Sequence, residues 1–255
     1  MMTGEREKEL INAAAMLLDA RRTNTPIDDL PAALQPVTLD EAYFVQDRLA
    51  LAYGEIGGWK VGAPTADATP TFAPMPLAWI ASNDAELVGK HRFRGLEAEI
   101  AFQMGKDMPP RENAYSRDEV VAAIGSCHPA IEVIESGLAD PTKAARLSMI
   151  ADLQMHGAFV YGAAVPNWQN IDFLKEHVTL AVNGVVRVER TGSNTSGDLM
   201  RLLPWLANEG ATRTGGLKAG QWVTTGSWTG LALAIAGSCV DVTFSTAGEV
   251  HLRFE

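Results

Sequence analysis

Residues 96–102 place an apolar side chain at every second position, and this spacing constrains the fold more than any other local feature of the chain. Glu97 and Glu99 stand between the apolar residues at 96, 98 and 100. Successive side chains of a β-strand point to opposite faces, so the spacing predicts a strand with one apolar face. The other face carries two carboxylates, roughly 6.6 Å apart at a rise of about 3.3 Å per residue.

A third carboxylate, Glu132, interrupts the apolar run 129–134, and Glu135 beside it takes the opposite face, so one of these two points inward. Like charges are costly to bury unless a positive group lies between them. Three carboxylates converging from two strands would form an all-oxygen site for a divalent cation such as Mg²⁺ or Mn²⁺. The alternative for Glu97 and Glu99 is a solvated strand face, because charged side chains are usually exposed.

Bulk properties exclude several classes of function. The chain has 255 residues, enough for a large buried core, and a formal net charge of −10. This charge argues against nucleic acid or an anionic membrane as the main partner. Cys127 and Cys239 are expected to be inert buried thiols in a reducing compartment. We see no signal-peptide pattern and no apolar run of membrane length, so a soluble cytoplasmic protein is expected.

The first part of the chain has helical periodicity. Residues 5–21 carry an apolar stripe, and a second helix is predicted to begin after the cap at Thr38 and to end near Gly54. The remainder has short β-like runs divided by glycine and proline. We therefore predict an α+β fold, with a helical N-terminal segment over residues 1–56 and a β-rich catalytic domain over residues 57–255.

Several local signals lie within this second part. Residues 63–90 contain many prolines and are predicted to be rich in loops. Asn183-Gly184 lies between two β-branched runs and predicts a hairpin with positive φ at both turn residues. The other expected elements are short helices from 116 to about 124, over 140–152 and over 198–208, and a hairpin around 247–248.

Three further features could carry chemistry. Lys60 is flanked by glycines and could place an ammonium opposite an anionic substrate, or it could be a surface lysine. The loop Thr225-Gly226-Ser227 could offer hydroxyls and amides to a carboxylate or phosphate, or it could simply be a turn. His156 could be a general base, although a structural histidine is the more common case.

Several short segments, taken together, resemble a known family. They are residues 58–62, 97–101, 105–109, 129–133, 151–152, 205–208, 217–220 and 225–227. In this combination the chain resembles the 2-keto-4-pentenoate hydratases of the fumarylacetoacetate hydrolase superfamily, which also contains the 4-oxalocrotonate decarboxylases. The resemblance extends from about residue 40 to the C-terminus.

The resemblance implies a distorted mixed β-roll with an N-terminal helical segment, assembled as a homo-oligomer. It implies that Glu97, Glu99 and Glu132 bind Mg²⁺ or Mn²⁺, and that the ion chelates a small-molecule 2-keto acid. Lys60 and the 225–227 loop would hold the acid end of this substrate. The implied activity is a metal-dependent hydro-lyase that adds water to a 2-keto-4-enoate in aromatic catabolism.

One departure from the family concerns proton transfer. The hydratases carry an acid in an Asp-Phe-Gly-type loop, whereas residues 71–78 of this chain contain no acid. As a hypothesis, His156 or Asp152 supplies the missing acid–base function. The alternative activities are decarboxylation of a 2-oxo-enedioate, hydrolysis of a C–C bond as elsewhere in the superfamily, and non-catalytic keto-acid binding, which the missing acid favours.

Overall fold

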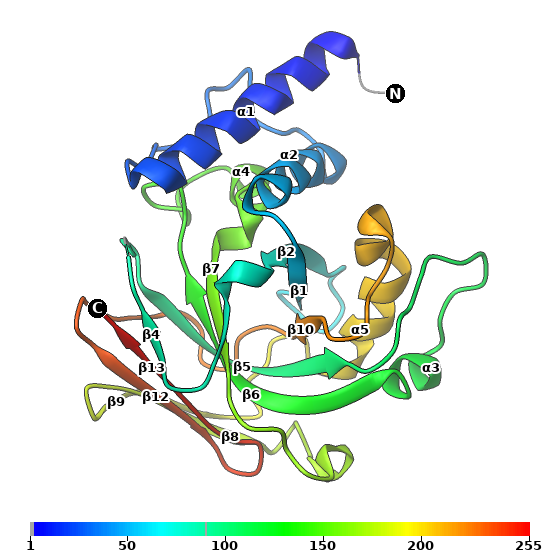
Figure 1. Cartoon of the computed structure of the whole chain (residues 1–255), viewed down its shortest axis with the longest axis vertical. Helices are drawn as coiled ribbons and strands as arrows, with labels where there is room; N and C mark the ends of the chain where they lie inside the picture. Colours follow the sequence, from blue (N-terminus) through cyan, green and yellow to red (C-terminus); the bar gives the residue numbers. More distant parts are fainter. Residues whose placement is uncertain (1–2, 90) are drawn as a thin grey trace.

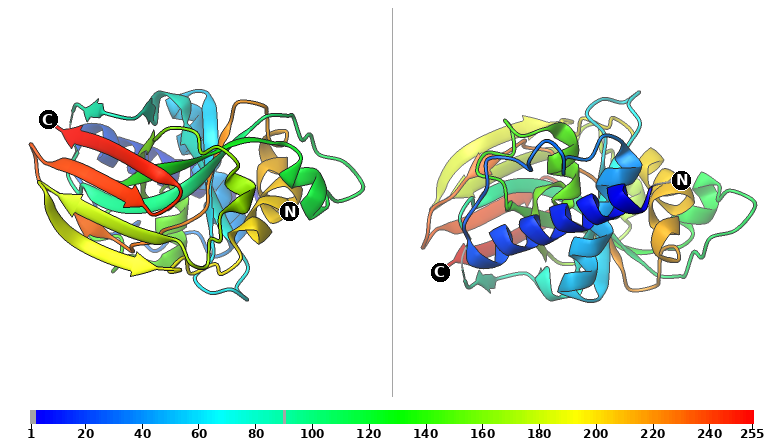
Figure 2. Two further views of the ribbon diagram at one scale, coloured as in Figure 1. Left: turned by 90° about the horizontal axis from the view of Figure 1, so that it is seen from below. Right: turned by 90° about the horizontal axis from the view of Figure 1, so that it is seen from above.

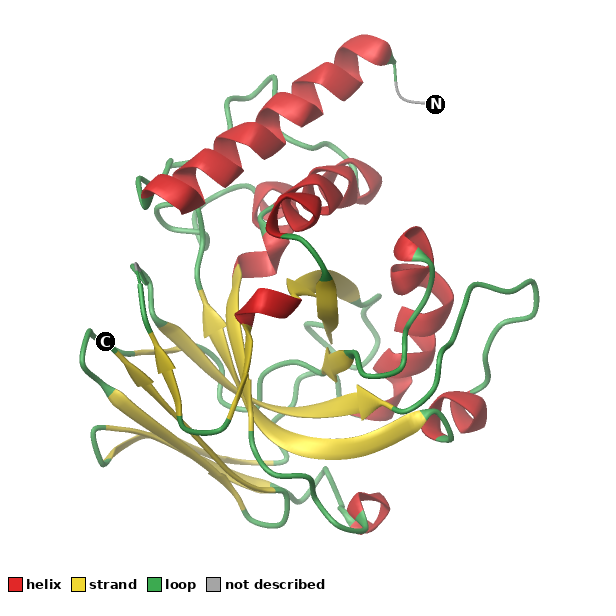
Figure 3. Cartoon of the chain, in the orientation of Figure 1, coloured by secondary structure: helices red, strands yellow, loops and turns green. Residues whose placement is uncertain are grey.

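Two mixed β-sheets form the body of the protein, and the helices gather along one side and one end of them (Figures 1 and 3). The structure, a computed structural model, describes residues 3–89 and 91–255. Among these residues, a search for a membrane-spanning helix finds none of sufficient length and hydrophobicity. Sheets with both parallel and antiparallel pairs, covered by a few helices, confirm the predicted α+β class.

The larger sheet has the strand order β2-β1-β10-β5-β6-β7-β3, with β11 paired to β5. Its strands are β1 (Ile56–Gly62), β2 (Thr71–Pro76), β3 (Ile80–Ser82), β5 (Gly95–Met104), β6 (Ile124–Ile134), β7 (His156–Tyr161), β10 (Trp222–Thr224) and β11 (Ala232–Leu233). The long strands β5 and β6 run antiparallel through its centre. They place residues that lie far apart in the sequence next to one another.

The smaller sheet has the order β4-β13-β12-β8-β9, and Figure 2 shows the C-terminal hairpin of this sheet beside the yellow strands β8 and β9. Its strands are β4 (Ala85–Leu87), β8 (His177–Val182), β9 (Val185–Thr191), β12 (Cys239–Phe244) and β13 (Gly248–Phe254). The predicted hairpin joins β8 to β9, with φ of 54° at Asn183 and 74° at Gly184. The second predicted hairpin joins β12 to β13. Both hairpin predictions are confirmed.

The core between the sheets confirms the alternation predicted for β5. Leu96, Ala98, Ile100 and Phe102 are completely buried and belong to one apolar cluster with residues of the smaller sheet. β12 and β13 pack against β6 across this core. Since these side chains face the smaller sheet, the opposite face of β5 is left for the two glutamates.

The two predicted N-terminal helices are present as α1 (Gly4–Thr23) and α2 (Leu39–Tyr53). The Thr38 hydroxyl caps α2 by accepting a hydrogen bond from the Glu41 amide, and Gly54 ends the helix. α1 lies across α2, which contacts β2 and α4 (Figure 1). Buried residues of both helices belong to the same apolar cluster as the sheets. The division of the chain at residue 57 stays a prediction.

The remaining helices are short. They are α3 (Arg117–Val121), α4 (Arg146–Ala151) and α5 (Leu202–Trp205), with α5 inside a longer helical run from Leu199 to Thr214, and three 3₁₀ turns, Leu77–Trp79, Leu153–Met155 and Trp168–Asn170. The short helix predicted from 116 is present as α3, and Ser116 and Glu119 form a capping box at its start. The helix predicted over 140–152 forms only in its second half.

Two expectations were wrong. Residues 63–90, predicted to be rich in loops, contain the strands β2, β3 and β4, and β2 includes Pro74 and Pro76. β2 is the edge strand of its sheet, where a missing amide donor is tolerated. Cys239 is exposed at the start of β12, whereas Cys127 is completely buried as expected. The apolar neighbours of Cys239 in sequence do not cover it because β12 alternates between its two faces.

Candidate metal centre and active site

The central strands of the larger sheet bring the three predicted carboxylates together. Glu97 of β5 lies opposite Glu132 of β6 in the antiparallel register, and Glu99 lies two residues further along the same face of β5. One carboxylate oxygen from each residue lies within 4.8 Å of the others. Such a cluster of hard oxygen donors suits a divalent cation of the Mg²⁺ type.

One oxygen of Glu99 is held by the last residue of β10 and by the loop that follows this strand. The Thr224 hydroxyl donates a hydrogen bond to Oε2 of Glu99, and the Gly226 amide donates to the same oxygen at 2.9 Å. The other oxygen, Oε1, is buried without a hydrogen-bond partner in the described part of the chain. A buried carboxylate oxygen is costly to leave unpaired, so this free oxygen fits a role as a metal ligand.

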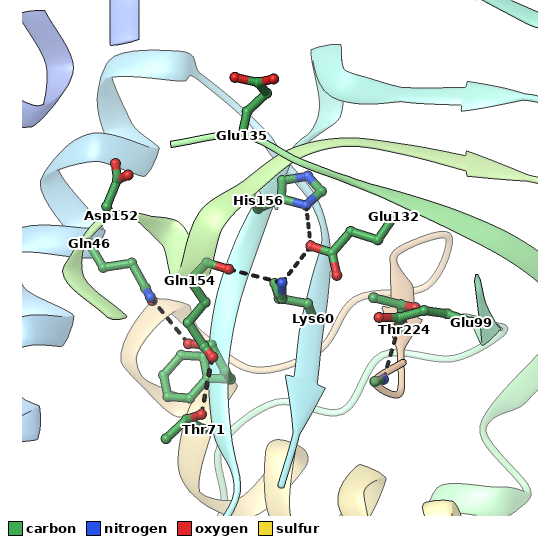
Figure 4. Close-up of polar contacts among 12 residues, drawn as sticks. Gln46, Lys60, Thr71, Glu99, Glu132, Glu135, Asp152, Gln154, His156 and Thr224 are labelled. Carbon is green, nitrogen blue, oxygen red and sulfur yellow. Dashed lines mark hydrogen bonds and ion pairs between the residues drawn. The ribbon is translucent and has the colours of Figure 1, made fainter. Parts of the chain in front are cut away.

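Among the described residues, Glu132 likewise has one oxygen with hydrogen-bond partners and one without. Its Oε1 lies 2.6 Å from Nζ of Lys60 and 2.9 Å from Nδ1 of His156 (Figure 4). Its Oε2 is buried and, within residues 3–89 and 91–255, has no hydrogen-bond partner. Two carboxylates of the cluster thus each keep one oxygen fixed and one free. The residues present fit a divalent cation.

Burial and mutual repulsion perturb the pKa values of these carboxyls. Burial raises the pKa of Glu97 to about 7, and Glu132 adds to the rise while Lys60 opposes it. Burial and the charges of Glu132 and Glu97 raise the pKa of Glu99 well above its usual range. Burial alone would also raise the pKa of Glu132, but Lys60 and His156 lower it to about 2. Lys60 therefore does not balance the negative charge of three ionised carboxylates, and a divalent cation would supply the missing positive charge.

Lys60 lies on β1, next to the cluster, with 14% of its side chain exposed. Besides Glu132, its ammonium donates a hydrogen bond to the carbonyl of Gln154 at 3.0 Å. Burial alone would lower the pKa of Lys60, but the glutamates around it raise the pKa overall. The lysine is therefore charged and is available beside the carboxylates.

His156 is completely buried at the start of β7, and its ring packs 5.9 Å from that of Trp79. Burial lowers the pKa of His156, more than Glu132 raises it, which favours a neutral imidazole near pH 7. Its Nε2 has no hydrogen-bond partner among the residues that the structure describes. The structure therefore brings His156 into contact with one carboxylate of the cluster.

The structure does not bring Asp152 to the cluster. One oxygen of this buried carboxylate lies 2.5 Å from Nε of Arg21, and the other accepts hydrogen bonds from the Ser136 hydroxyl and the Gly137 amide. Figure 4 shows Asp152 on the far side of its turn from Glu132. Through these partners, Asp152 links α1 to the loop at Ser136 and Gly137.

The three residues of the predicted binding loop, 225–227, have different partners. The Thr225 hydroxyl donates to the carbonyl of Ile100, so it is occupied within the sheet. The Gly226 amide is occupied by Glu99. The Ser227 hydroxyl is buried and faces the carboxyl of Glu97, whose pKa it lowers. Of the three residues, Ser227 alone directs its side chain at the cluster, and the role of the loop in binding substrate stays a prediction.

Sequence reasoning missed three residues that support the site, one beside the cluster and two behind it. Thr224 holds Glu99, the carbonyl of Gln154 holds Lys60, and Arg21 holds Asp152 from α1. Thr224 stands one residue before the segment that the resemblance singled out, which was the available signal. For Arg21 and Gln154 the sequence contains no such signal.

Comparisons with known proteins agree with this geometry. Residues 66–255 match the fumarylacetoacetate (FAA) hydrolase C-terminal family. The chain is 28% identical over 158 residues to a 2-hydroxyhexa-2,4-dienoate hydratase from Comamonas testosteroni, covering 62% of this chain and 59% of the relative. It is 27% identical over 136 residues to a 4-oxalocrotonate decarboxylase from Pseudomonas putida, covering 53% and 51%. These alignments span little more than half the length of each curated relative.

Among solved structures, a 4-oxalocrotonate decarboxylase from Pseudomonas putida G7, complexed with magnesium and adipate, has a similar fold. Its TM-score is 0.84 at 24% identity, and all of both chains is covered. The same enzyme complexed with calcium and acetate gives a TM-score of 0.83. These matches confirm the predicted β-roll with its N-terminal helices. Because the family match covers most of its length, the chain belongs to the fumarylacetoacetate (FAA) hydrolase C-terminal family.

Proposed function

We propose that the protein is a metal-dependent hydro-lyase that adds water to a 2-hydroxy-2,4-dienoate, the enol form of a 2-keto-4-enoate. The observation that carries this proposal is the cluster of Glu97, Glu99 and Glu132, of which the last two are buried and each keep one free oxygen. The 28% identity to a dienoate hydratase supports the choice of reaction. Breakdown of aromatic compounds is the setting in which such dienoates arise.

In this proposal Glu97, Glu99 and Glu132 hold Mg²⁺ or Mn²⁺. The bound ion would act as a Lewis acid that stabilises negative charge on the oxygens of the keto acid. Lys60 supplies a second positive charge, which favours binding of the substrate carboxylate beside the cluster. The Ser227 hydroxyl, next to Glu97, is a further hydrogen-bond donor beside the cluster.

Hydration requires two changes along the conjugated chain. The dienol takes up a proton at its distal carbon, which gives an α,β-unsaturated ketone, and water then adds to this ketone. A residue of the site must move these protons. His156 is our candidate, since its imidazole is neutral near pH 7 and has a free nitrogen. Full turnover by a His156→Ala variant would remove His156 from this role. Asp152 is the weaker candidate because its oxygens are occupied.

A second candidate is decarboxylation of a 2-oxo-enedioate of the 4-oxalocrotonate type. The fold likeness to such a decarboxylase over the whole chain favours it. The chemistry is closely related, since loss of CO₂ leaves the same kind of enolate for the site to stabilise.

Absorbance spectroscopy with purified protein tests both candidates. A hydratase removes the dienol chromophore when Mg²⁺ is present and stops when a chelator is added, without release of CO₂. Release of CO₂ from an enedioate identifies the decarboxylase, and cleavage of a β-diketone identifies a C–C hydrolase. Metal-dependent binding of a keto acid without turnover of any of the three identifies a non-catalytic binder and contradicts the proposal.

Two further parts of the proposal concern the setting of the protein. From the family resemblance we expect a homo-oligomer that acts in the cytoplasm on a small-molecule substrate. Light scattering coupled to size-exclusion chromatography measures the assembly. A mass equal to one 27.4 kDa chain would contradict it.

A further inference from the structure

A left-handed turn lies directly behind Lys60 and His156. Leu153, Gln154 and Met155 have φ values of 52°, 47° and 63°, which non-glycine residues rarely adopt, least of all three in succession. Such a conformation persists only where surrounding contacts fix it, and it is typical of functional sites.

The turn serves the site through its backbone. The carbonyl of Gln154 accepts the hydrogen bond from the Lys60 ammonium at 3.0 Å. The carbonyl of Met155 accepts from the amide of Glu135, at the end of β6, at 2.8 Å. The next residue is His156, whose ring contacts Glu132. The conformation of these three residues therefore determines where both polar neighbours of Glu132 lie.

One guanidinium from α1 binds both ends of this turn. Arg21, whose side chain is 6% exposed, donates to the carboxylate of Asp152 at 2.5 Å and to its carbonyl at 2.8 Å. It also donates to the carbonyl of His156 at 2.9 Å and to that of Glu135 at 3.1 Å. The residue before the turn, the residue after it and the end of β6 thus share a single fivefold donor.

A glycine in the loop after β6 allows α1 to approach closely enough for this contact. A Cβ atom at Gly137 would lie 3.0 Å from the carbonyl oxygen of Leu17 and 3.3 Å from Cγ of Arg21. Glycine therefore permits the close approach of helix and loop. The same Gly137 donates its amide to Asp152.

From this geometry we infer that Arg21 is a positioning residue of the active site. It holds the turn at Leu153–Met155 in its left-handed form and so places Lys60 and His156 against Glu132. Arg21 itself touches neither the carboxylate cluster nor any group of the site that would meet substrate. The inference makes the N-terminal helix a part of the catalytic unit, and its catalytic consequence rests on the proposed function.

The test compares Arg21→Met and Arg21→Lys with two controls. Arg22→Met removes the same charge from the neighbouring, exposed residue. Leu10→Ala removes a completely buried side chain from α1, about 16 Å along the helix from Arg21, and so destabilises the helix without touching the turn. Lysine keeps the charge at position 21 but cannot bridge the same four acceptors. If Arg21→Met fails to fold, Arg21→Lys gives the decisive measurement.

We expect both Arg21 variants to lose kcat by about 100-fold, the scale of loss that a small misplacement of catalytic groups causes. We expect Mg²⁺ affinity to fall by about tenfold, as for other groups that orient metal ligands. Hydrogen exchange should accelerate at the amides of Met155 and Glu135, which bond across the turn. The controls should keep kcat, Mg²⁺ affinity and slow exchange at these amides, although Leu10→Ala melts at a lower temperature.

The inference is overturned if Leu10→Ala, with the same melting temperature as the Arg21 variants, loses as much kcat as they do. It is also overturned if exchange at Met155 and Glu135 is unchanged in both Arg21 variants. Should the wild-type protein turn over none of the proposed substrates, the proposed function fails, whereas hydrogen exchange and Mg²⁺ affinity still decide the role of Arg21.

Discussion

Replacing Glu99 by glutamine distinguishes the electrostatics of the metal-free cluster from its capacity to bind metal. Glutamine has the shape of a protonated glutamate, and its carbonyl can accept the hydrogen bonds from Thr224 and Gly226. Burial and the neighbouring carboxylates raise the pKa of Glu99 well above its usual range, so the metal-free fold favours the neutral form of this carboxyl, which glutamine resembles. Glu99→Gln should therefore leave the metal-free stability at pH 7 within about 1 kcal/mol of the wild type.

The geometry gives the scale of the repulsion involved. At 4.8 Å, two ionised carboxylate oxygens repel by about 3.5 kcal/mol if the effective dielectric constant is about 20. This repulsion corresponds to a rise of about 2.5 in the pKa of one carboxyl and adds to the effect of burial on Glu97 and Glu99. A divalent cation binds the ionised carboxylates and offsets their repulsion. Glutamine at position 99 cannot ionise, so it offers the cation no negative charge.

Calorimetry with and without Mg²⁺ measures the difference. Mg²⁺ at 100 times its Kd stabilises the wild type by about 2.7 kcal/mol, or about 5–11 °C in Tm. If Glu99→Gln weakens binding by about 100-fold, the same Mg²⁺ gives only about 0.4 kcal/mol, or about 1–2 °C. The exposed Glu112→Gln is the charge-matched control. A wild-type Mg²⁺ shift in Glu99→Gln would refute the assignment of Glu99 as a ligand.

Three further predictions concern pH, thiols and capping. The metal-free fold raises the pKa of Glu97 to about 7 and so binds more protons than the unfolded chain, and its stability should fall from pH 5 to 8. The free energy of unfolding in urea should decline less over this range in Glu97→Gln. An equal decline in the wild type and the variant would contradict this. Burial raises the pKa of Cys127 to about 12 whereas Cys239 is exposed, so a disulfide reagent should titrate one thiol in the native protein and two after unfolding; two reactive native thiols would disprove it. Thr38→Ala removes the α2 cap and should cost about 1 kcal/mol, or 2–4 °C in Tm; an unchanged Tm would show that the cap contributes nothing.

Local patterns predicted those parts of the fold that neighbouring residues determine. The cap at Thr38 and the positive φ of Asn183 and Gly184 follow from residue types within a few positions of one another. The same holds for the carboxylate face of β5, because a two-residue repeat suffices to place Glu97 and Glu99 on one side of a strand. The apolar run around Glu132 predicted a second strand, but the pairing of β5 with β6 that brings Glu132 to the other two is seen only in the structure.

The supports of the site depend on contacts that no local pattern reveals. Arg21 and Asp152 are 131 positions apart, and Thr224 and Glu99 are 125 apart. The left-handed turn at Leu153–Met155 contains neither glycine nor asparagine, the residues that usually indicate positive φ. Tertiary contacts impose this conformation against local preference, so the sequence alone could not show it.

Anomalous diffraction from crystals grown with MnCl₂ and oxalate tests the central claim most directly. Oxalate is a stable stand-in for the two adjacent oxygens of a 2-keto acid, and manganese is identified by its anomalous signal. The account predicts one strong peak bounded by Glu97, Glu99 and Glu132, with oxalate bound to it on the side of Lys60. Manganese bound elsewhere, or no peak at this position at saturating manganese, would contradict it.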